Sequence, residues 1–375
     1  MRNIVIVGGS VAAVAAADAL RQLGHDGAIT VLSDETHAPY VRPPLSKAIL
    51  KGSETPDSAA IGIDDGIDLR LDAKATGIDL SRNRVIVDGG EEVAFDGLVI
   101  ASGARARRVL SDHTESVLRD LGDAIELRSR LESARSMLVV GGGFLGMEIA
   151  STARSLGLDV TVIDMVSHLE RQFGPYLAER MTTAATAHGV RLVVDPGGVD
   201  FLDTRPLTGV RASDGTVYEA DLVVSAVGDV PNVEWLELTG LATAAGVPTD
   251  SRCRVTERIV AAGDVAIVQN DRSGARRTPH WGAAIDQARV AASALLQGDA
   301  AEPYRARPYF WTEQWGLDMK ICGTIGAGDA ECIEGSWEEG SAVIRFRDAH
   351  GPVAAVTVNR RMPIPALRKL ATAER

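Results

Sequence analysis

Cysteine is scarce in this 375-residue chain, and its spacing excludes two common roles. Cys253, Cys322 and Cys332 are the complete set, an odd number without a C-x-x-C pair. Such spacing argues against a disulfide framework and against a structural zinc site. We therefore expect a protein that holds neither disulfides nor a metal ion.

Long apolar runs and a basic overall charge are also missing. The longest weakly polar stretch, residues 4–17, is too short for a transmembrane helix of about 20 residues. Gly8 and Gly9 interrupt it, and no small-residue cleavage site follows a basic start, so it does not resemble a secretion signal. A formal charge of −12 disfavours nucleic-acid binding, which needs a basic surface. These absences predict a cytoplasmic protein that binds neither nucleic acid nor membrane.

Aromatic side chains are few, at 4%, whereas glycine accounts for 38 residues. A glycine-rich chain with many alanines and valines is typical of α/β folds with tight turns between strands and helices. The length predicts about two or three domains.

One strand–turn–helix–strand pattern occurs twice, 133 residues apart. Its elements are expected at residues 3–7, 11–23 and 28–32 in the first copy and at 137–140, 144–156 and 160–163 in the second. The interval is too long for a solenoid repeat, so the two copies predict two nucleotide-binding domains.

The turn of the second copy carries a complete G-x-G-x-x-G motif at Gly141, Gly143 and Gly146. The glycines allow a tight turn, close approach of a pyrophosphate and close helix–strand packing, while the helix N-terminus favours an anion. Asp164 follows Gly146 by 18 residues, at a strand end where a carboxylate binds a ribose hydroxyl. The flanking strand and helix favour a nucleotide site over a glycine-rich turn without a ligand.

The first copy has a degenerate motif, with Gly8, Ser10 and Ala13 in the three glycine positions. Ser and Ala are the smallest replacements, so close approach of a ligand stays feasible, and Glu35 or Asp34 is placed to bind a ribose. By spacing alone, a packed alanine-rich core helix remains an open alternative.

The segment from Arg42 to Lys47 contains two consecutive prolines, which predict a rigid, extended stretch with Ser46 as a helix N-cap. Taken alone, Lys47 and Glu148 have the pattern of solvated surface charges, and Trp311 that of a core or interface residue. After residue 298 the residue pattern changes: aromatic residues cluster, and segments with the alternating pattern of strands follow. This change predicts a third, α+β domain.

Residues 39–47, with Pro39, Tyr40 and the Arg42–Lys47 run, resemble the signature of ferredoxin reductases that serve oxygenases and bacterial cytochromes P450. These are putidaredoxin-reductase-like and biphenyl-dioxygenase-reductase-like flavoproteins, related to apoptosis-inducing factor. Further matches follow in order at residues 101–105, 141–148, 227–232, 261–265, 280–284, 308–314, 358–360 and 367–368. The chain departs from the pattern at Val41, Ser102 and Asp229.

The resemblance implies an α/β fold with two Rossmann-like domains, for FAD and NAD, in a glutathione-reductase-like architecture, plus a C-terminal α+β domain. The expected boundaries are 1–106 and 230–300 for the FAD domain, 107–229 for the NAD domain and 301–375 for the C-terminal domain.

The resemblance also implies site residues. The implied catalytic residues are Lys47 and Glu148, which match the family's Lys–Glu pair, and Trp311, which matches its aromatic residue beside the nicotinamide and the flavin. The implied FAD-binding residues are Gly8, Ser10, Ala12, Ala13, Glu35, Arg42, Lys47, Ala75, Ser102, Gly103, Arg128, Asp264, Trp281 and Trp311. The implied NADH-binding residues are Gly141, Gly143, Gly146, Asp164 and Gly228.

By this resemblance the chain is an FAD-dependent NADH:ferredoxin oxidoreductase of the EC 1.18.1 class. Electrons would pass to a [2Fe-2S] or other small ferredoxin that feeds a P450 or Rieske oxygenase. NADPH is disfavoured, since Asp164 would repel a 2′-phosphate. Two alternatives are a pyridine nucleotide-disulfide or peroxide-type flavin reductase, which needs a redox cysteine near the flavin, and an NADH-binding signalling flavoprotein similar to apoptosis-inducing factor.

A ferredoxin is generally acidic, so a local basic surface is needed to attract it to this acidic chain. Residues 341–375 hold seven Arg and Lys against two Asp and Glu, a net charge of +5. This stretch is the candidate docking site, against the alternative of an ordinary solvated surface.

Overall fold

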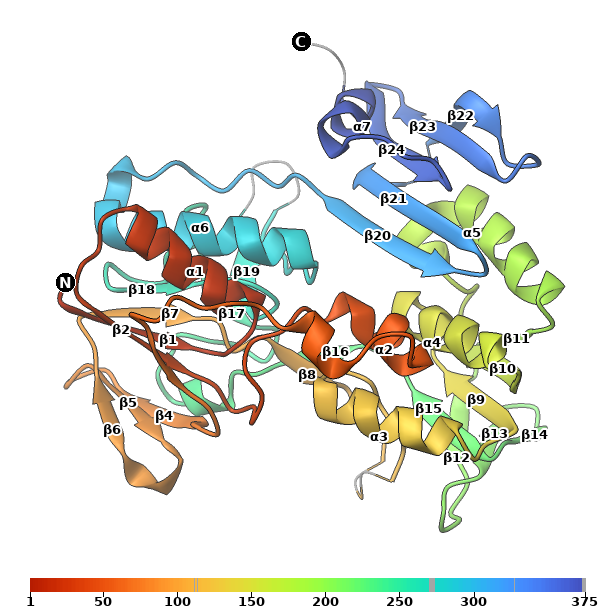
Figure 1. Ribbon diagram of the computed structural model, residues 1–375, viewed down its shortest axis with the longest axis horizontal. Helices are drawn as coiled ribbons and strands as arrows, with labels where there is room; N and C mark the ends of the chain where they lie inside the picture. Colours follow the sequence, from red (N-terminus) through yellow and green to blue (C-terminus); the bar gives the residue numbers. More distant parts are fainter. Residues whose placement is uncertain (111, 113, 270–273, 327, 373–375) are drawn as a thin grey trace. The chain divides into compact units, whose positions relative to one another are not determined.

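Two compact units make up the computed structural model, which describes residues 1–110, 112, 114–269, 274–326 and 328–372 (Figure 1). Unit one comprises Met1–Val41, Asp57–Arg105 and Asp229–Arg307, and unit two comprises Arg42–Pro56, Ala106–Gly228 and Pro308–Arg375. The predicted NAD and C-terminal domains both fall in unit two, each with a sheet of its own. The division into three domains remains a prediction.

A five-stranded parallel sheet forms the centre of unit one, in the order β18-β7-β1-β2-β3. Its strands are β1 (Asn3–Val7), β2 (Ala28–Leu32), β3 (Asp68–Arg70), β7 (Gly97–Ile100) and β18 (Ile259–Ala261). The helices α1 (Val11–Gln22) and α6 (Trp281–Gln297) lie side by side (Figure 1). Their buried faces are mostly alanine, which lets the two helices approach each other closely.

Smaller strands complete unit one. They are β4 (Ala75–Asp79), β5 (Arg84–Val87), β6 (Glu92–Ala94), β8 (Ala104–Ala106), β16 (Asp229–Pro231), β17 (Val247–Thr249) and β19 (Ala266–Val268), of which β8 ends one residue beyond the division. β4, β5 and β6 form an antiparallel sheet.

Unit two contains a four-stranded parallel sheet in the order β11-β10-β9-β15. Its strands are β9 (Ser136–Val140), β10 (Asp159–Asp164), β11 (Arg191–Val194) and β15 (Leu222–Ser225), and its helices are α3 (Leu121–Leu131), α4 (Phe144–Ser155) and α5 (Glu170–Ala187). A three-stranded antiparallel sheet adds β12 (Val199–Phe201), β13 (Gly209–Ala212) and β14 (Val217–Glu219).

The C-terminal part of unit two is a five-stranded antiparallel sheet in the order β20-β21-β24-β23-β22. Its strands are β20 (Tyr309–Gln314), β21 (Leu317–Gly323), β22 (Asp329–Ser336), β23 (Ser341–Asp348) and β24 (Gly351–Val358), and α7 (Ile364–Leu370) packs on β21 and β24. The α/β class with parallel sheets and a C-terminal α+β part is confirmed.

Both predicted strand–turn–helix–strand copies are present, and no end is shifted by more than one residue. The prediction for residues 42–47 was wrong, because Pro43–Ser46 form a 3₁₀ helix that leads into the short helix α2 (Ala48–Lys51). Lys47, not Ser46, occupies the N-cap position of α2. Among the described residues, no helix is both long and apolar enough to cross a membrane.

Candidate functional site

The glycine-rich turn before α4 requires glycine at two of its three motif positions. Gly141 has a φ of +105°, and a Cβ there would lie 2.4 Å from the carbonyl oxygen of Ala226. A Cβ on Gly146 would lie 1.9 Å from the carbonyl oxygen of Gly141. The turn therefore packs α4 against β9 more closely than any side chain allows.

The N-terminus of α4 is open to an anion. Its N-cap is Gly143, in an extended conformation, and no side chain caps the helix. The first backbone N–H groups of a helix have no partner within it, so this end can donate to a pyrophosphate. The residues present thus fit a dinucleotide.

Asp164 lies at the carboxyl end of β10, beside this turn. Its Oδ2 accepts a hydrogen bond from the backbone N–H of Gly142 at 2.6 Å, whereas Oδ1 accepts a long one, 3.3 Å, from Val166. Oδ1 therefore retains capacity for a ribose hydroxyl. His168 packs against Gly142, and burial lowers the pKa of this histidine, which keeps it neutral next to the nucleotide turn at pH 7.

The turn before α1, in unit one, has the same character despite its degenerate motif. Gly8 has a φ of +120°, and a Cβ there would lie 2.0 Å from the carbonyl oxygen of Ala101. Ser10 is the extended N-cap of α1, and its hydroxyl makes no capping hydrogen bond. Ala12 and Ala13 are buried, and the N–H of Ala13 donates to the carbonyl oxygen of Ser10 at 2.9 Å. Because no side chain caps α1, this helix start can accept a second diphosphate group.

Two further FAD candidates in unit one are held by neighbouring side chains. Glu35 Oε2 accepts a hydrogen bond from the Tyr40 hydroxyl at 2.5 Å, which orients the carboxylate. The Ser102 hydroxyl donates to the carbonyl oxygen of Asn232 at 2.8 Å, and the Asn232 amide donates back to Ser102 at 2.9 Å. Ser102 thus fixes the loop that contains Gly103.

Asp229, a departure from the family pattern, is an ion-pair partner. Its Oδ2 lies 2.6 Å from Arg277 Nη2, and the two side chains are 26% and 19% exposed. Arg277 also donates to the backbone carbonyl of Asp264 at 3.2 Å. His280 is the N-cap residue of α6 and Trp281 its first residue. Burial, the largest influence, lowers the pKa of His280, although the Asp264 carboxylate opposes the shift.

Lys47 and Glu148 meet inside unit two. Lys47 Nζ lies 2.6 Å from Glu148 Oε2, and the two side chains are 14% and 9% exposed. The Ser46 hydroxyl donates to the same oxygen at 2.5 Å. The Lys–Glu pair that the resemblance implies is therefore present, and the alternative of two solvated surface charges was wrong.

Aromatic rings gather at the start of α4. Phe144 lies 4.8 Å from Phe173 and 5.1 Å from Phe310, measured between ring centroids. Trp311 follows Phe310 on β20 and stacks with Tyr309 at 6.0 Å. No sequence pattern predicted this cluster, although Phe144 occupies a variable position of the G-x-G-x-x-G motif.

The remaining predicted residues lie in separate places. In unit two, Arg42 donates to the carbonyl oxygen of Arg119 at 2.6 Å, Arg128 lies against Gly52, and the exposed Gly228 has a φ of +108°. In unit one, Ala75 is the first residue of β4.

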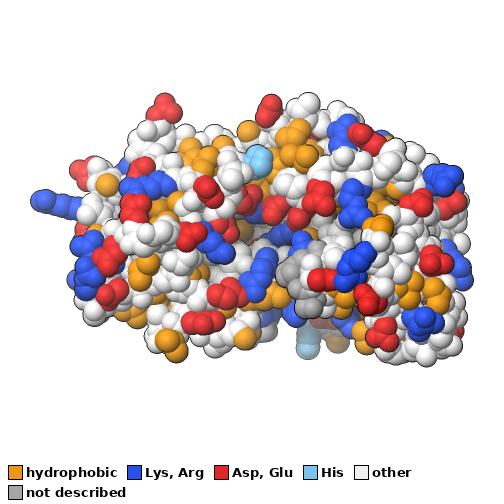
Figure 2. Space-filling view, turned by 90° about the horizontal axis from the view of Figure 1, so that it is seen from below, with side chains coloured by type: hydrophobic (Ala, Val, Ile, Leu, Met, Phe, Trp, Pro, Cys, Tyr) orange, Lys and Arg blue, Asp and Glu red, His pale blue; other side chains and the backbone are white. Residues whose placement is uncertain are grey.

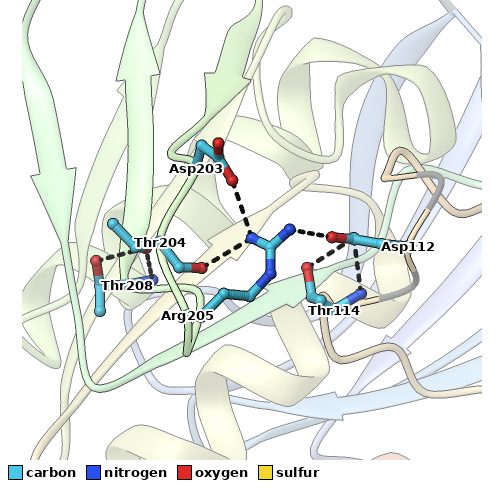
Figure 3. A network of polar contacts seen from close by, with 6 residues as sticks. All are labelled: Asp112, Thr114, Asp203, Thr204, Arg205 and Thr208. Atoms are coloured by element: carbon cyan, nitrogen blue, oxygen red, sulfur yellow. Dashed lines mark hydrogen bonds and ion pairs between the residues drawn. The ribbon is translucent and has the colours of Figure 1, made fainter.

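A second polar network in unit two has a different character (Figure 3). Arg205 bridges Asp112 and Asp203, and Thr114 donates to Asp112. The side chains of Arg205 and Asp203 are 57% and 96% exposed. Exposed ion pairs contribute little, so we assign this network to a solvated surface, in contrast to the buried Lys47–Glu148 pair.

Comparison with known proteins agrees with this geometry. Residues 2–288, which contain both glycine-rich turns, match the pyridine nucleotide-disulphide oxidoreductase family. The chain belongs to this family. Ferredoxin–NAD(+) reductases of this family use FAD and NADH.

Three similar proteins match most of this chain. Rhodocoxin reductase of Rhodococcus erythropolis is 36% identical over 90% of this chain and 82% of its own length. The ferredoxin–NAD(+) reductase component of the 3-phenylpropionate/cinnamic acid dioxygenase of Photorhabdus laumondii subsp. laumondii is 32% identical over 99% and 96%. The structure of the covalent putidaredoxin reductase–putidaredoxin complex has a TM-score of 0.87 at 29% identity, covering 99% and 93%.

Proposed function

We propose that this protein is an FAD-dependent NADH:ferredoxin oxidoreductase that supplies electrons to an oxygenase. The observation that carries the proposal is a pair of open nucleotide-binding turns in a chain without a redox-active cysteine pair. Relatives that match nearly the whole chain are ferredoxin–NAD(+) reductase components. The partner is a small iron–sulfur protein, and the terminal acceptor is an oxygenase of the Rieske or P450 type.

Each unit contributes residues of a defined kind. In unit one, the N-terminus of α1 and the Glu35 carboxylate would hold the diphosphate and ribose of FAD. In unit two, the Gly141–Gly146 turn and Asp164 would hold NADH. Bound FAD supplies the coupling between a two-electron donor and a one-electron acceptor. Lys47 offers a positive charge whose direction is set by Glu148, which suits stabilisation of negative charge on a reduced cofactor.

The cysteines oppose the disulfide-reductase alternative. Cys253 and Cys322 are fully buried, and burial raises the pKa of both thiols, which disfavours the reactive thiolate. Cys332 is exposed and forms no disulfide. Unpaired thiols are typical of proteins in reducing compartments, and we propose a cytoplasmic location.

Reconstitution tests the function. The purified protein should carry one FAD per chain, and NADH with a [2Fe-2S] ferredoxin should sustain cytochrome c reduction. A long-lived reduced flavin with little transfer to any ferredoxin would instead support the signalling role. A colourless protein that takes up no FAD would contradict both.

NADH should be preferred over NADPH, and Asp164→Ser should reduce this preference about tenfold, because one ribose hydrogen bond and the repulsion of a 2′-phosphate are lost. The measurement is kcat/KM for both nucleotides with ferricyanide as acceptor. Asp159→Ser, at the exposed start of the same strand, is the matched control and should leave the ratio unchanged. An NADPH preference in the unmodified protein would refute the assignment.

The basic C-terminal stretch provides a docking prediction. Arg360 pairs with Glu334 and Arg345 with Glu331, so part of its charge is balanced locally, and Glu374 and Arg375 lie outside the described residues. On the face in Figure 2, acidic and basic side chains are interspersed. Only a local patch can therefore attract an acidic ferredoxin.

Replacing Arg360 and Arg361 together by glutamate should raise the KM for ferredoxin about fivefold and flatten its salt dependence, since rim charges act mainly on association. Flavin reduction by NADH without ferredoxin should not change. The same charge change at Arg82 and Arg84, in β5 and the turn before it, is the control. If the two double variants behave alike, this stretch is not the docking site.

A further inference from the structure

One face of strand β20 lies along helix α4, both within unit two. Side chains alternate along a strand, so Phe310, Thr312 and Gln314 share a face, whereas positions i, i+4 and i+7 share a face of a helix. Three contacts join the elements in register: the rings of Phe144 and Phe310 at 5.1 Å, Glu148 Oε1 and Thr312 Oγ1 at 2.7 Å, and Ser151 Oγ with the backbone N–H of Trp315 at 2.9 Å. The nucleotide-binding helix is thus fixed to the C-terminal sheet.

We call the contact between β20 and α4 the seam. Along it, the donors and acceptors of the hydrogen bonds can be arranged in only one way. The Trp315 indole can only donate, so the atom of Gln314 that lies 3.0 Å from its Nε1 must be the amide oxygen. Gln314 Nε2 therefore faces Thr312 Oγ1 at 2.9 Å and donates to it. Because a hydroxyl has one proton, Thr312 must use its own to donate to Glu148. These hydrogen bonds form a relay from Trp315 through Gln314 to Thr312, which donates to Glu148.

The relay ends on Oε1, the oxygen of Glu148 that Lys47 does not contact. Lys47 and Ser46 both donate to Oε2, whereas Thr312 donates to Oε1. Thr312 and Gln314 are 0% and 2% exposed, so the seam offers Oε1 little access to solvent. Without the Thr312 hydroxyl, Oε1 would lose this donor. Because a buried carboxylate oxygen without a hydrogen bond is unfavourable, the carboxylate would rotate toward other donors.

We propose that Thr312 and Gln314 are positioning residues that hold the Glu148 carboxylate and so set the direction of the Lys47 ammonium. The proposal rests on the proposed function in that Lys47 acts on the flavin. A buried polar side chain costs folding free energy unless all its hydrogen bonds are made. A valine in place of Thr312 would fill the same volume without that requirement, so packing alone does not call for threonine. The relay therefore serves orientation, not packing.

Thr312→Val is the direct test. We expect reduction of the flavin by NADH to slow about tenfold in stopped-flow measurements, the loss typical for one hydrogen bond to a charged group. The KM for NADH should stay within about twofold, since Asp164 and the Gly141–Gly146 turn are unaltered. Thr312→Ser keeps the hydroxyl and should restore the rate.

The chemical reactivity of the Lys47 amine provides a measurement that does not depend on turnover. Acylation of Lys47 with acetic anhydride, measured by mass spectrometry against the exposed Lys51, should become severalfold faster in Thr312→Val. The wild-type rate should be slow, because Lys47 is 14% exposed and ion-paired. Thr312→Ser should react like the wild type. If Thr312→Val fails to fold, Gln314→Met removes the donor to Thr312 and should show the same changes at smaller size.

A double-variant comparison separates positioning from general damage. In a Glu148→Gln background, Thr312→Val should add little further loss, because both changes act through the same carboxylate. Equal losses in Thr312→Val and Thr312→Ser, full additivity with Glu148→Gln, or unchanged Lys47 acylation would each overturn the proposal. Failure of the proposed function would appear differently, as absent ferredoxin reduction with the acylation pattern intact.

Discussion

Replacing Lys47 with alanine is expected to slow flavin reduction by NADH about a hundredfold, the size of effect seen when one preorganised charge-stabilising donor is lost. The side chain is held by Glu148 at 2.6 Å in a setting that is only 14% exposed, so its charge is both directed and poorly screened. FAD should remain bound, because the diphosphate-binding turn of unit one is unaltered. Anaerobic stopped-flow absorbance provides the rate, and the flavin spectrum provides the FAD content.

Lys51→Ala is the matched control for this change. Lys51 is the exposed last residue of α2, the helix whose N-cap position Lys47 occupies, so its removal changes the net charge equally without affecting the Glu148 carboxylate. Its reduction rate should equal that of the unmodified protein. An unchanged rate in Lys47→Ala would show that Lys47 does not take part in flavin reduction. The Lys47–Glu148 ion pair would then have a structural role only.

Gly146→Ala should raise the KM for NADH about a hundredfold, the typical cost of a displacement near 1 Å in a binding site. The added Cβ would lie 1.9 Å from the carbonyl oxygen of Gly141, a backbone atom that cannot move independently of β9. Helix α4 must shift, and its N-terminus then no longer meets the pyrophosphate. The measurements are the KM for NADH and the FAD content, which should stay at one per chain because Gly146 belongs to the second turn.

Gly62→Ala provides the control for an added methyl group. A Cβ at Gly62 meets no atom within 4 Å, and its backbone conformation is accessible to alanine. Kinetics with NADH should be unchanged in this variant. If Gly146→Ala also left the KM unchanged, the second turn would not be the NADH site.

Both glycine-rich turns were predictable from the sequence because their chemistry is local. A β-branched strand, a positive φ that only glycine tolerates well and an alanine-rich helix all lie within about 20 residues. For the same reason the position of Asp164 at a strand end followed from spacing alone. The degenerate first turn could be predicted only ambiguously, since Ser10 and Ala13 also suit a packed helix.

The resemblance implied the pair of Lys47 and Glu148, whereas the residues that hold this pair became visible only in the tertiary structure. Lys47 and Glu148 are 101 residues apart, and Glu148 and Thr312 are 164 apart, so no periodicity relates them. Ser46 has the local pattern of a helix cap, yet it lies one residue before the N-cap position of α2, and its hydroxyl donates to the buried Glu148 carboxylate. Local propensity is a property of neighbouring residues, whereas the partner of a buried charge is chosen by which elements the fold brings into contact. Local sequence was therefore enough to predict the two glycine-rich turns, whereas the packing of α2, α4 and β20 produced the buried polar contacts around Glu148.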